Sequence, residues 1–385
     1  MMNSHVKTDL APIPFIDVAS QRARLGRRID EAVARVLDHC RFVNGPEVTE
    51  LEQKLAAFAG AKHAISCSSG TDALAMILMA WGVGPGDAVF CPAFTFCATA
   101  EVVPWVGASP VFVDVLEDTF NMDPASLKAA IKVAVDKGLN PRVVVPVDLF
   151  GQPADLDAIE AIAREHGLKI LCDTAQGFGA TWHGKRTGSF GDATATSFFP
   201  AKPLGCFGDG GAIFTDDDDL VPVLKSVREH GQGVDKYENV RIGMTGRLDT
   251  IQAAILLEKL TIFEDEIAAR QRVAARYNEA LADICVVPVV DPRATSVWAQ
   301  YTIRLPHGVR DGLAATLQKE GVPTAVYYRI PMHRQPAYAQ YPSAGNGLPV
   351  CERLSGEVIS LPMHAYLDAA SQERVIAAVR RALKA

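Results

Sequence analysis

Over its first two-thirds the chain alternates short apolar, β-rich runs with longer stretches of helical spacing. The expected strands are, in order, 62–67, 88–92, 110–115, 143–150, 168–172, 193–199 and 211–215. Helical patterns lie between the first five of them, at 71–81, 124–137 and 155–165. This alternation predicts an α/β fold, in which a mostly parallel seven-stranded sheet is covered on both faces by helices.

The last third of the chain departs from this alternation. A long helical stretch is expected at 248–281, and after it come shorter elements: strands at 298–305 and 323–328, and helices at 311–320 and 371–383. This order predicts a smaller α+β unit. We therefore expect a large domain over 1–262, which includes the N-terminal segment, and a small C-terminal domain over 263–385.

Composition excludes several classes of protein. A net charge of −7 without a Lys/Arg run argues against a nucleic-acid-binding surface. No apolar stretch reaches membrane-spanning length, and residues 1–10 contain no apolar signal core, so we expect no membrane association and a cytoplasmic location. The eight cysteines lie singly, without a C-x-x-C pair, which favours free thiols over disulfides and predicts no metal site.

Lys202 is the main candidate for chemistry. It lies between an apolar run that begins at Ser197 and a glycine-rich segment that ends at Gly211, where its amine can be desolvated and its pKa lowered. Upstream, Asp173 ends the apolar strand 168–172. A lysine for the aldehyde and an aspartate for the ring nitrogen are the groups that pyridoxal 5'-phosphate (PLP) requires. Singly, the two residues could be a surface lysine and a helix cap, but their combination favours the cofactor.

The same cofactor needs a phosphate site and an aromatic ring. Residues 66–74 read as a strand end, a turn of small residues and a helix start, which suits phosphate, although a plain helix cap has the same pattern. The Ser197 hydroxyl is a second phosphate candidate. For stacking on the ring, Phe94 and Phe96 follow the strand 88–92, and either one could instead belong to the core.

Five motifs together resemble one family of enzymes. They are Ser-Ser-Gly-Thr-Asp-Ala-Leu (68–74), Phe-Thr-Phe-Cys-Ala-Thr-Ala (94–100), Asp-Thr-Ala-Gln (173–176), Ser-Phe-Phe-Pro-Ala-Lys-Pro-Leu-Gly (197–205) and Arg-Leu-Asp-Thr-Ile-Gln-Ala-Ala (247–254). This set is similar to that of the DegT/DnrJ/EryC1/StrS family of PLP-dependent nucleotide-sugar aminotransferases. The resemblance implies PLP-dependent transferase fold type I. It further implies glutamate as amino donor and a UDP-linked 2-acetamido-2-deoxy-3-oxo-glucuronate as acceptor, for surface-polysaccharide synthesis.

The resemblance also implies residue roles. Lys202 would bind the cofactor covalently and move a proton, Asp173 would keep the ring nitrogen protonated, Gln176 would bind the ring hydroxyl and Phe96 would stack on the ring. The phosphate would be bound by Gly70, Thr71, Asp72 and Ser197.

Two departures from the family pattern concern the partner and the substrate. Thr245 replaces an asparagine that in the family reaches the cofactor phosphate of the partner subunit, so we expect a homodimer with shared active sites and Thr245 as a cofactor contact. Tyr327, Tyr328 and Arg329 replace the usual His-Tyr-Pro at the substrate end. With Arg247 they are the expected substrate residues, although Arg329 could be an ordinary surface arginine.

Three other functions remain open from the sequence. The substrate could be a neutral 3- or 4-keto-6-deoxy sugar nucleotide, or the chain could be a non-catalytic PLP-bound regulator. A nicotinamide dehydrogenase also has an α/β fold, but the glycine-rich run 82–86 follows a helix and precedes a strand, which is the wrong order for a dinucleotide site.

Overall fold

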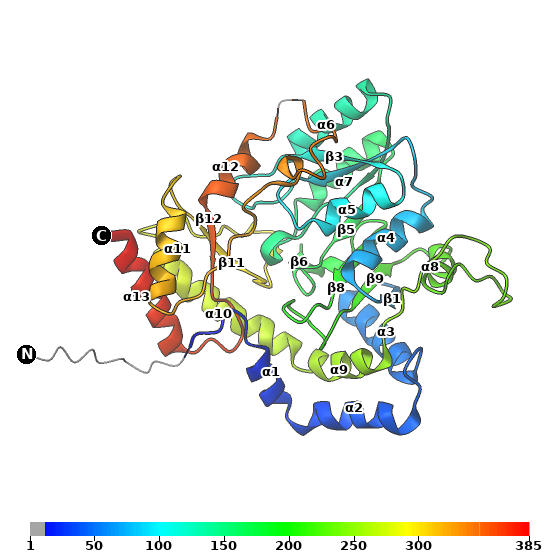
Figure 1. The fold of residues 1–385 in the computed structure, drawn as a ribbon, viewed down its shortest axis with the longest axis horizontal. Coiled ribbons are helices and arrows are strands. Elements are labelled where there is room, and N and C mark those ends of the chain that lie inside the picture. The colour runs from blue at the N-terminus through cyan, green and yellow to red at the C-terminus, as the bar shows by residue number, and fades with distance from the viewer. Residues whose placement is uncertain (1–11, 346, 385) are drawn as a thin grey trace, which may run out of the picture.

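The computed structural model describes residues 12–345 and 347–384. Its centre is a seven-stranded sheet of order β1-β9-β8-β5-β4-β2-β3 (Figure 1). The strands are β1 (His63–Cys67), β2 (Asp87–Pro92), β3 (Ser109–Val113), β4 (Asn140–Val144), β5 (Lys169–Asp173), β8 (Ala193–Ser197) and β9 (Gly211–Thr215). Only β9 runs against its neighbours, so the predicted mostly parallel α/β sheet is confirmed. The prediction for residues 1–10 lies outside the described residues.

Helices cover both faces of this sheet. The chain crosses it in one direction through α4 (Gly70–Ala80) and α5 (Ala98–Trp105) and returns through α6 (Pro124–Asp136) and α7 (Leu156–His166). Right-handed crossovers place these two pairs on opposite faces. At the β1 end, alternate residues of β9 face two different cores, because Ile213 packs in the core of α4 and Phe214 in that of α3 (Pro46–Ala59) and α9 (Thr250–Leu260).

A second hydrophobic core lies in the C-terminal third. It is built by α10 (Phe263–Leu281), α11 (Arg310–Lys319), α13 (Ala369–Lys384) and the antiparallel pair β11 (Tyr301–Arg304) and β12 (Val358–Leu361). The segment before β12 returns to the core of the large sheet, which also contains α4. Met332 and Leu354 are buried there, and the N–H of Phe112 in β3 donates to the carbonyl of Pro342. The division at 262/263 therefore stays a prediction.

Three predicted elements are wrong in detail. The run 143–150 is not one strand, because β4 ends at Val144 and residues Leu149–Gly151 form a 3-10 turn (η1). The stretch 248–281 is two helices, α9 and α10, and the first turn of α10 is acidic, as helix N-termini favour. Residues 323–328 form no strand beyond a bridge from Ala325 to Ser360. In each case an apolar or helical pattern continues across a break that local periodicity does not reveal.

Other elements were not expected from the sequence. They are α3, α5, β12, α1 (Val18–Leu25), α2 (Arg27–His39), α8 (Leu220–Arg228), α12 (Pro349–Glu357) and a small sheet of β10 (Ala294–Thr295), β6 (Thr181–Trp182) and β7 (Lys185–Arg186). Over residues 12–345 and 347–384, no helix is long and apolar enough to cross a membrane.

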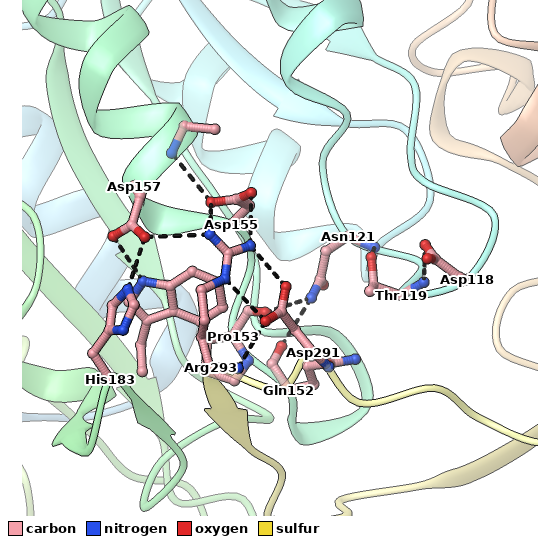
Figure 2. A network of polar contacts seen from close by, with 12 residues as sticks. Asp118, Thr119, Asn121, Gln152, Pro153, Asp155, Asp157, His183, Asp291 and Arg293 are labelled. Carbon is pink, nitrogen blue, oxygen red and sulfur yellow. Dashed lines mark hydrogen bonds and ion pairs between the residues drawn. The ribbon is translucent and has the colours of Figure 1, made fainter.

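An ion network around Arg293 joins the small sheet to helix α7 of the large one. Arg293 lies between Asp155 and Asp291, with nitrogen–oxygen distances of 3.0 and 2.7 Å, and a third carboxylate, Asp157, lies 3.3 Å away (Figure 2). Its guanidinium also lies over the ring of Trp182 in β6, 4.3 Å from the ring centre. Because Asp155 caps α7, this network joins the segment after α10 to both α7 and β6.

Candidate active site

A cavity of about 810 Å³ lies where β5 and β8 end. Asp173 is the last residue of β5 and Ser197 the last of β8, and both line it. The carboxyl ends of parallel strands are the usual position for a ligand site in such sheets. Ten of the predicted site residues line this cavity: Gly70, Thr71, Phe96, Asp173, Gln176, Ser197, Lys202, Tyr327, Tyr328 and Arg329.

Asp173 is a buried carboxylate held by hydrogen bonds. Its Oδ2 accepts from the Thr99 hydroxyl at 2.8 Å, and its Oδ1 accepts from the N–H of Ala175 at 3.1 Å. Burial raises the pKa of Asp173, while these two donors and the charge of Lys202 oppose the rise. No arginine or lysine forms an ion pair with Asp173 within the described part of the chain, so it can accept a bond from a protonated ring nitrogen.

Lys202 lies across the same cavity on a tight turn after β8. Its backbone N–H donates to the carbonyl of Phe199 at 2.8 Å, which curls the turn back toward the strand end. Burial lowers the pKa of the Lys202 amine, and the charge of Asp173 opposes that effect. A more easily deprotonated amine is the form that attacks an aldehyde, so the setting suits covalent attachment of the cofactor.

Gln176 and Tyr328 form a pair at the cavity wall. The Gln176 Oε1 accepts from the N–H of Phe150 at 2.8 Å, and its Nε2 donates to the Tyr328 hydroxyl at 3.1 Å. Both ends of the amide are thus oriented, leaving one N–H of the Nε2 group for a ligand oxygen. Burial raises the pKa of Tyr328, which keeps its hydroxyl neutral. Tyr328, predicted only as a substrate residue, therefore also positions Gln176.

The start of α4 forms a polar cradle that suits phosphate. Among the described residues, the N–H groups of Gly70 and Thr71 donate to no acceptor, whereas the next N–H is capped by the Ser69 hydroxyl at 3.0 Å. A β-carbon on Gly70 would lie 2.6 Å from the β-carbon of Ser197, so only glycine fits here. Free N–H groups at a helix N-terminus beside a serine hydroxyl are a suitable anion site.

The two candidate stacking residues, Phe94 and Phe96, differ in burial. Phe94 is 1% exposed and packs against Phe120, Phe150 and Tyr328, so it belongs to the core. Phe96 is 52% exposed and lines the cavity. The ring available to stack on a ligand is therefore Phe96, and its stacking role stays a prediction.

Three predicted residues do not line this cavity in the single chain. The Asp72 carboxylate accepts from the hydroxyls of Ser68 and Ser69, and so orients the turn before α4. Thr245 lies exposed on the long loop between α8 and α9, where its hydroxyl contacts His230 at 2.7 Å. On the same loop, Arg247 is paired with Glu229 at 2.8 Å.

Arg329 lies at the exposed side of the cavity. Its guanidinium is paired with Asp311 at 3.2 Å, and both side chains are well exposed. A pair of this kind is weak, because water and salt screen it, so a bound anion can compete for the arginine.

Two residues that contact Asp173 were missed from the sequence. Thr99, which binds Asp173, lies within the 94–100 motif, and its position in the first turn of the following helix could have identified it. Asp148 is 1% exposed, its Oδ2 has no partner among the described residues, and its backbone N–H donates to the carbonyl of Asp173 at 3.0 Å. Burial raises the pKa of Asp148 well above its usual value, and the charge of Asp173 adds to the rise. No local pattern predicts such a buried acid.

Comparison with known proteins identifies the family. The sequence profile of the DegT/DnrJ/EryC1/StrS aminotransferase family matches residues 23–380. The chain belongs to this family. It is 49% identical over 368 residues to the UDP-2-acetamido-2-deoxy-3-oxo-D-glucuronate aminotransferase of Pseudomonas aeruginosa, covering 95% of this chain and 99% of the relative.

Solved structures of the family agree in fold. A DegT/DnrJ/EryC1/StrS aminotransferase from Brucella abortus superposes with a TM-score of 0.95 at 51% identity, covering 97% of this chain and all (100%) of that one. NtdA from Bacillus subtilis, solved with bound cofactor PMP, superposes with a TM-score of 0.88 at 30% identity, covering 98% of this chain and 87% of that one. The chain is an aminotransferase of PLP-dependent fold type I, as predicted.

Proposed function

We propose that this enzyme transfers the amino group of glutamate to C3 of a UDP-linked 2-acetamido-2-deoxy-3-oxo-glucuronate, in the cytoplasm, as a step toward surface polysaccharide. The observation that carries the proposal is a single cavity in which a desolvated lysine and a buried aspartate lie together with Arg329. The relative from Pseudomonas aeruginosa, named for this substrate, supports the choice of acceptor.

The residues present fit PLP. Its phosphate would be bound by the N–H groups at the start of α4 and by Ser197, its ring nitrogen by Asp173, its ring hydroxyl by Gln176 and its ring face by Phe96. When bound, PLP supplies an electron sink for the bond broken at the amino-acid carbon. Asp173 stabilises positive charge at the ring nitrogen, which strengthens that sink. Lys202 is the base placed to take the proton from that amino-acid carbon and to donate it again later in the transfer.

The proposed active form is a homodimer with shared sites. The loop between α8 and α9 projects from the molecule beside α8 (Figure 1). It carries Val234, Tyr237 and Ile242, which are 109%, 83% and 85% exposed, together with Thr245 and Arg247. Apolar side chains on a projecting arm favour burial against a second copy. An isologous dimer would bring Thr245 and Arg247 of each subunit to the partner's cavity, where Arg247 would add one cation for a nucleotide diphosphate.

A neutral 3- or 4-keto-6-deoxy sugar nucleotide is the second candidate acceptor. The favouring observation is the ion pair of Arg329 with Asp311, because an arginine already bound to a carboxylate is less available to read a uronate. A non-catalytic PLP-bound regulator has no comparable support, since the cavity contains both groups that proton transfer requires.

A substrate panel tests the proposal. Purified enzyme would be incubated with glutamate and matched pairs of keto-sugar nucleotides, with and without the uronate carboxylate, and the products would be read by mass spectrometry. We expect amination of the UDP-linked 3-oxo-glucuronate in preference to its neutral counterpart. Preference for a neutral 6-deoxy sugar would replace the acceptor, whereas no amination of any keto sugar would contradict the function itself.

A further inference from the structure

Helix α9 holds the turn that carries Lys202, although none of its eleven residues lines the cavity. We name residues 198–208 the Lys202 turn. It is folded tightly on itself: the N–H of Cys206 donates to the carbonyl of Phe198 at 2.8 Å, and a β-carbon on Gly205 would lie 2.6 Å from the carbonyl oxygen of Phe199. The Lys202 turn lies between β8 and β9 and contains no helix or strand, so its position depends on what packs against it.

Lys259 contacts this turn from α9. Its side chain is completely buried, with 0% exposure, and its Nζ donates to the carbonyl of Gly205 at 2.6 Å. The amine also lies 4.2 Å from the centre of the Phe207 ring. Burial lowers the pKa of Lys259 to about 8, and the neighbouring Cys206 and Glu266 oppose that effect. Burying an amine costs free energy that an apolar side chain would not cost, so a lysine here calls for a role in binding the turn.

Gln252 contacts the same turn seven residues earlier on α9. Its Oε1 accepts from the N–H of Phe207 at 2.8 Å, and its Nε2 faces the carbonyl of the same residue at 3.4 Å. Residues seven apart lie on one face of a helix. One face of α9 therefore binds the backbone at Gly205 and Phe207, which are three and five residues after Lys202.

We propose that Gln252 and Lys259 are positioning residues that fix the Lys202 amine in the cavity. The proposal rests on the proposed role of Lys202 in proton transfer. That role requires the amine to return to the same place in each turnover, and a displacement of about 1 Å at a reacting group can cost about 100-fold in rate. α9 supplies this constraint from outside the cavity, since none of its residues lines it.

The test compares Lys259→Met and Gln252→Met with a matched control in the cofactor-loaded enzyme. Gln372→Met is the control for lost packing and hydrogen bonding, because Gln372 is buried and its Nε2 donates to the carbonyl of Val273 at 2.8 Å in the second core. Amide exchange at Phe207 would be measured together with kcat and KM for glutamate. Gln252→Glu, which keeps an acceptor for the Phe207 N–H, is the rescue variant.

We expect kcat to fall about 10-fold in both α9 variants with KM for glutamate almost unchanged, and Phe207 to exchange at least about 10-fold faster in Gln252→Met. Gln252→Glu should recover most of kcat, and Gln372→Met should leave kcat and Phe207 exchange as they are. If both α9 variants match the control, the positioning role is wrong. Should Lys259→Met fail to fold, the kcat and exchange of Gln252→Met decide.

Lys202→Ala, measured in the same assay, separates the two proposals. An inactive Lys202→Ala with normal α9 variants would overturn the positioning role alone. A Lys202→Ala enzyme that still transaminates would overturn the proposed function, and with it the reason for positioning that amine.

Discussion

The Lys202–Asp173 cavity and the Arg293 network both contain a cationic side chain and carboxylates, but the pKa values shift in opposite directions in the two regions. In the network, hydrogen bonds from Arg293 lower the pKa of Asp291, and contact with Asp291 raises the pKa of Arg293 in return. In the cavity, burial lowers the pKa of Lys202 and raises that of Asp173. Paired charges near the surface are stabilised as ions, whereas the cavity holds a base and an acid whose ionised forms lack an ion pair.

This contrast indicates where chemistry and where stability reside. A charge that several partners satisfy, as three carboxylates do for Arg293, contributes to the fold and has little capacity left for a ligand. A charge that burial disfavours becomes stable when a ligand supplies the missing partner, and such groups mark functional sites. Substitutions in the two regions should therefore separate activity from stability.

The largest effect should follow Lys202→Ala. We expect transamination to fall by at least about 10⁴-fold, because the variant loses both covalent attachment and the proton-transferring base. Cofactor should still bind through the phosphate cradle and Gln176. The checks are a half-reaction with glutamate, followed by absorbance, and cofactor retention on gel filtration. Arg293→Ala is the control and should remain active; equal losses of activity in the two variants would contradict the separation of activity from stability.

Asp173→Asn should come next. We expect the half-reaction with glutamate to slow by about 10²- to 10³-fold, because an amide cannot stabilise a protonated ring nitrogen as a carboxylate does. The cofactor-free protein should unfold at the same or a higher temperature, since the buried ionised form is lost. Asp291→Asn, the matched substitution in the network, should show the reverse: full activity and a lower melting temperature. Near-native half-reaction rates for Asp173→Asn would show that it is not the partner of the ring nitrogen.

Arg329 shares a property with each region, because it lines the cavity and is also ion-paired; Arg329→Ala tests which property matters. We expect the apparent KM for the uronate to rise about 10-fold and that for the matching neutral sugar to change little, as for loss of one charge-assisted hydrogen bond. Steady-state kinetics with both sugars measure the difference. Equal changes in the two KM values would mean that Arg329 does not bind the carboxylate.

Arg293→Ala should have the smallest effect, a loss of about 1 kcal/mol in the free energy of unfolding at neutral pH with activity unchanged. The folded pKa of Asp291 is lowered, so its contribution is present above the unfolded pKa of about 3.9 and is lost as pH falls through the lower folded value. The difference between wild type and variant in urea unfolding should therefore shrink below about pH 4. A difference that persists there would show that packing on Trp182 dominates.

The sequence predicts the sheet and most of the cavity for one shared reason. Strand periodicity and the small-residue turns are local, and the turns that contain Gly70 and Lys202 follow directly from the strands that place them. Local patterns could not show that Asp148 contacts Asp173, or that Asp155 and Asp291 both pair with Arg293. These contacts include pairs of segments that lie far apart in the chain. The break between α9 and α10 was missed because both helices continue one apolar pattern.

Borohydride reduction of the enzyme as isolated, followed by peptide mapping, identifies the lysine that carries the cofactor. The desolvated lysine of the cavity should be labelled, and none of the chain's other lysines. We expect a pyridoxyl group on Lys202 alone, with none on the buried Lys259. Labelling of a different lysine, or of none, would contradict this expectation.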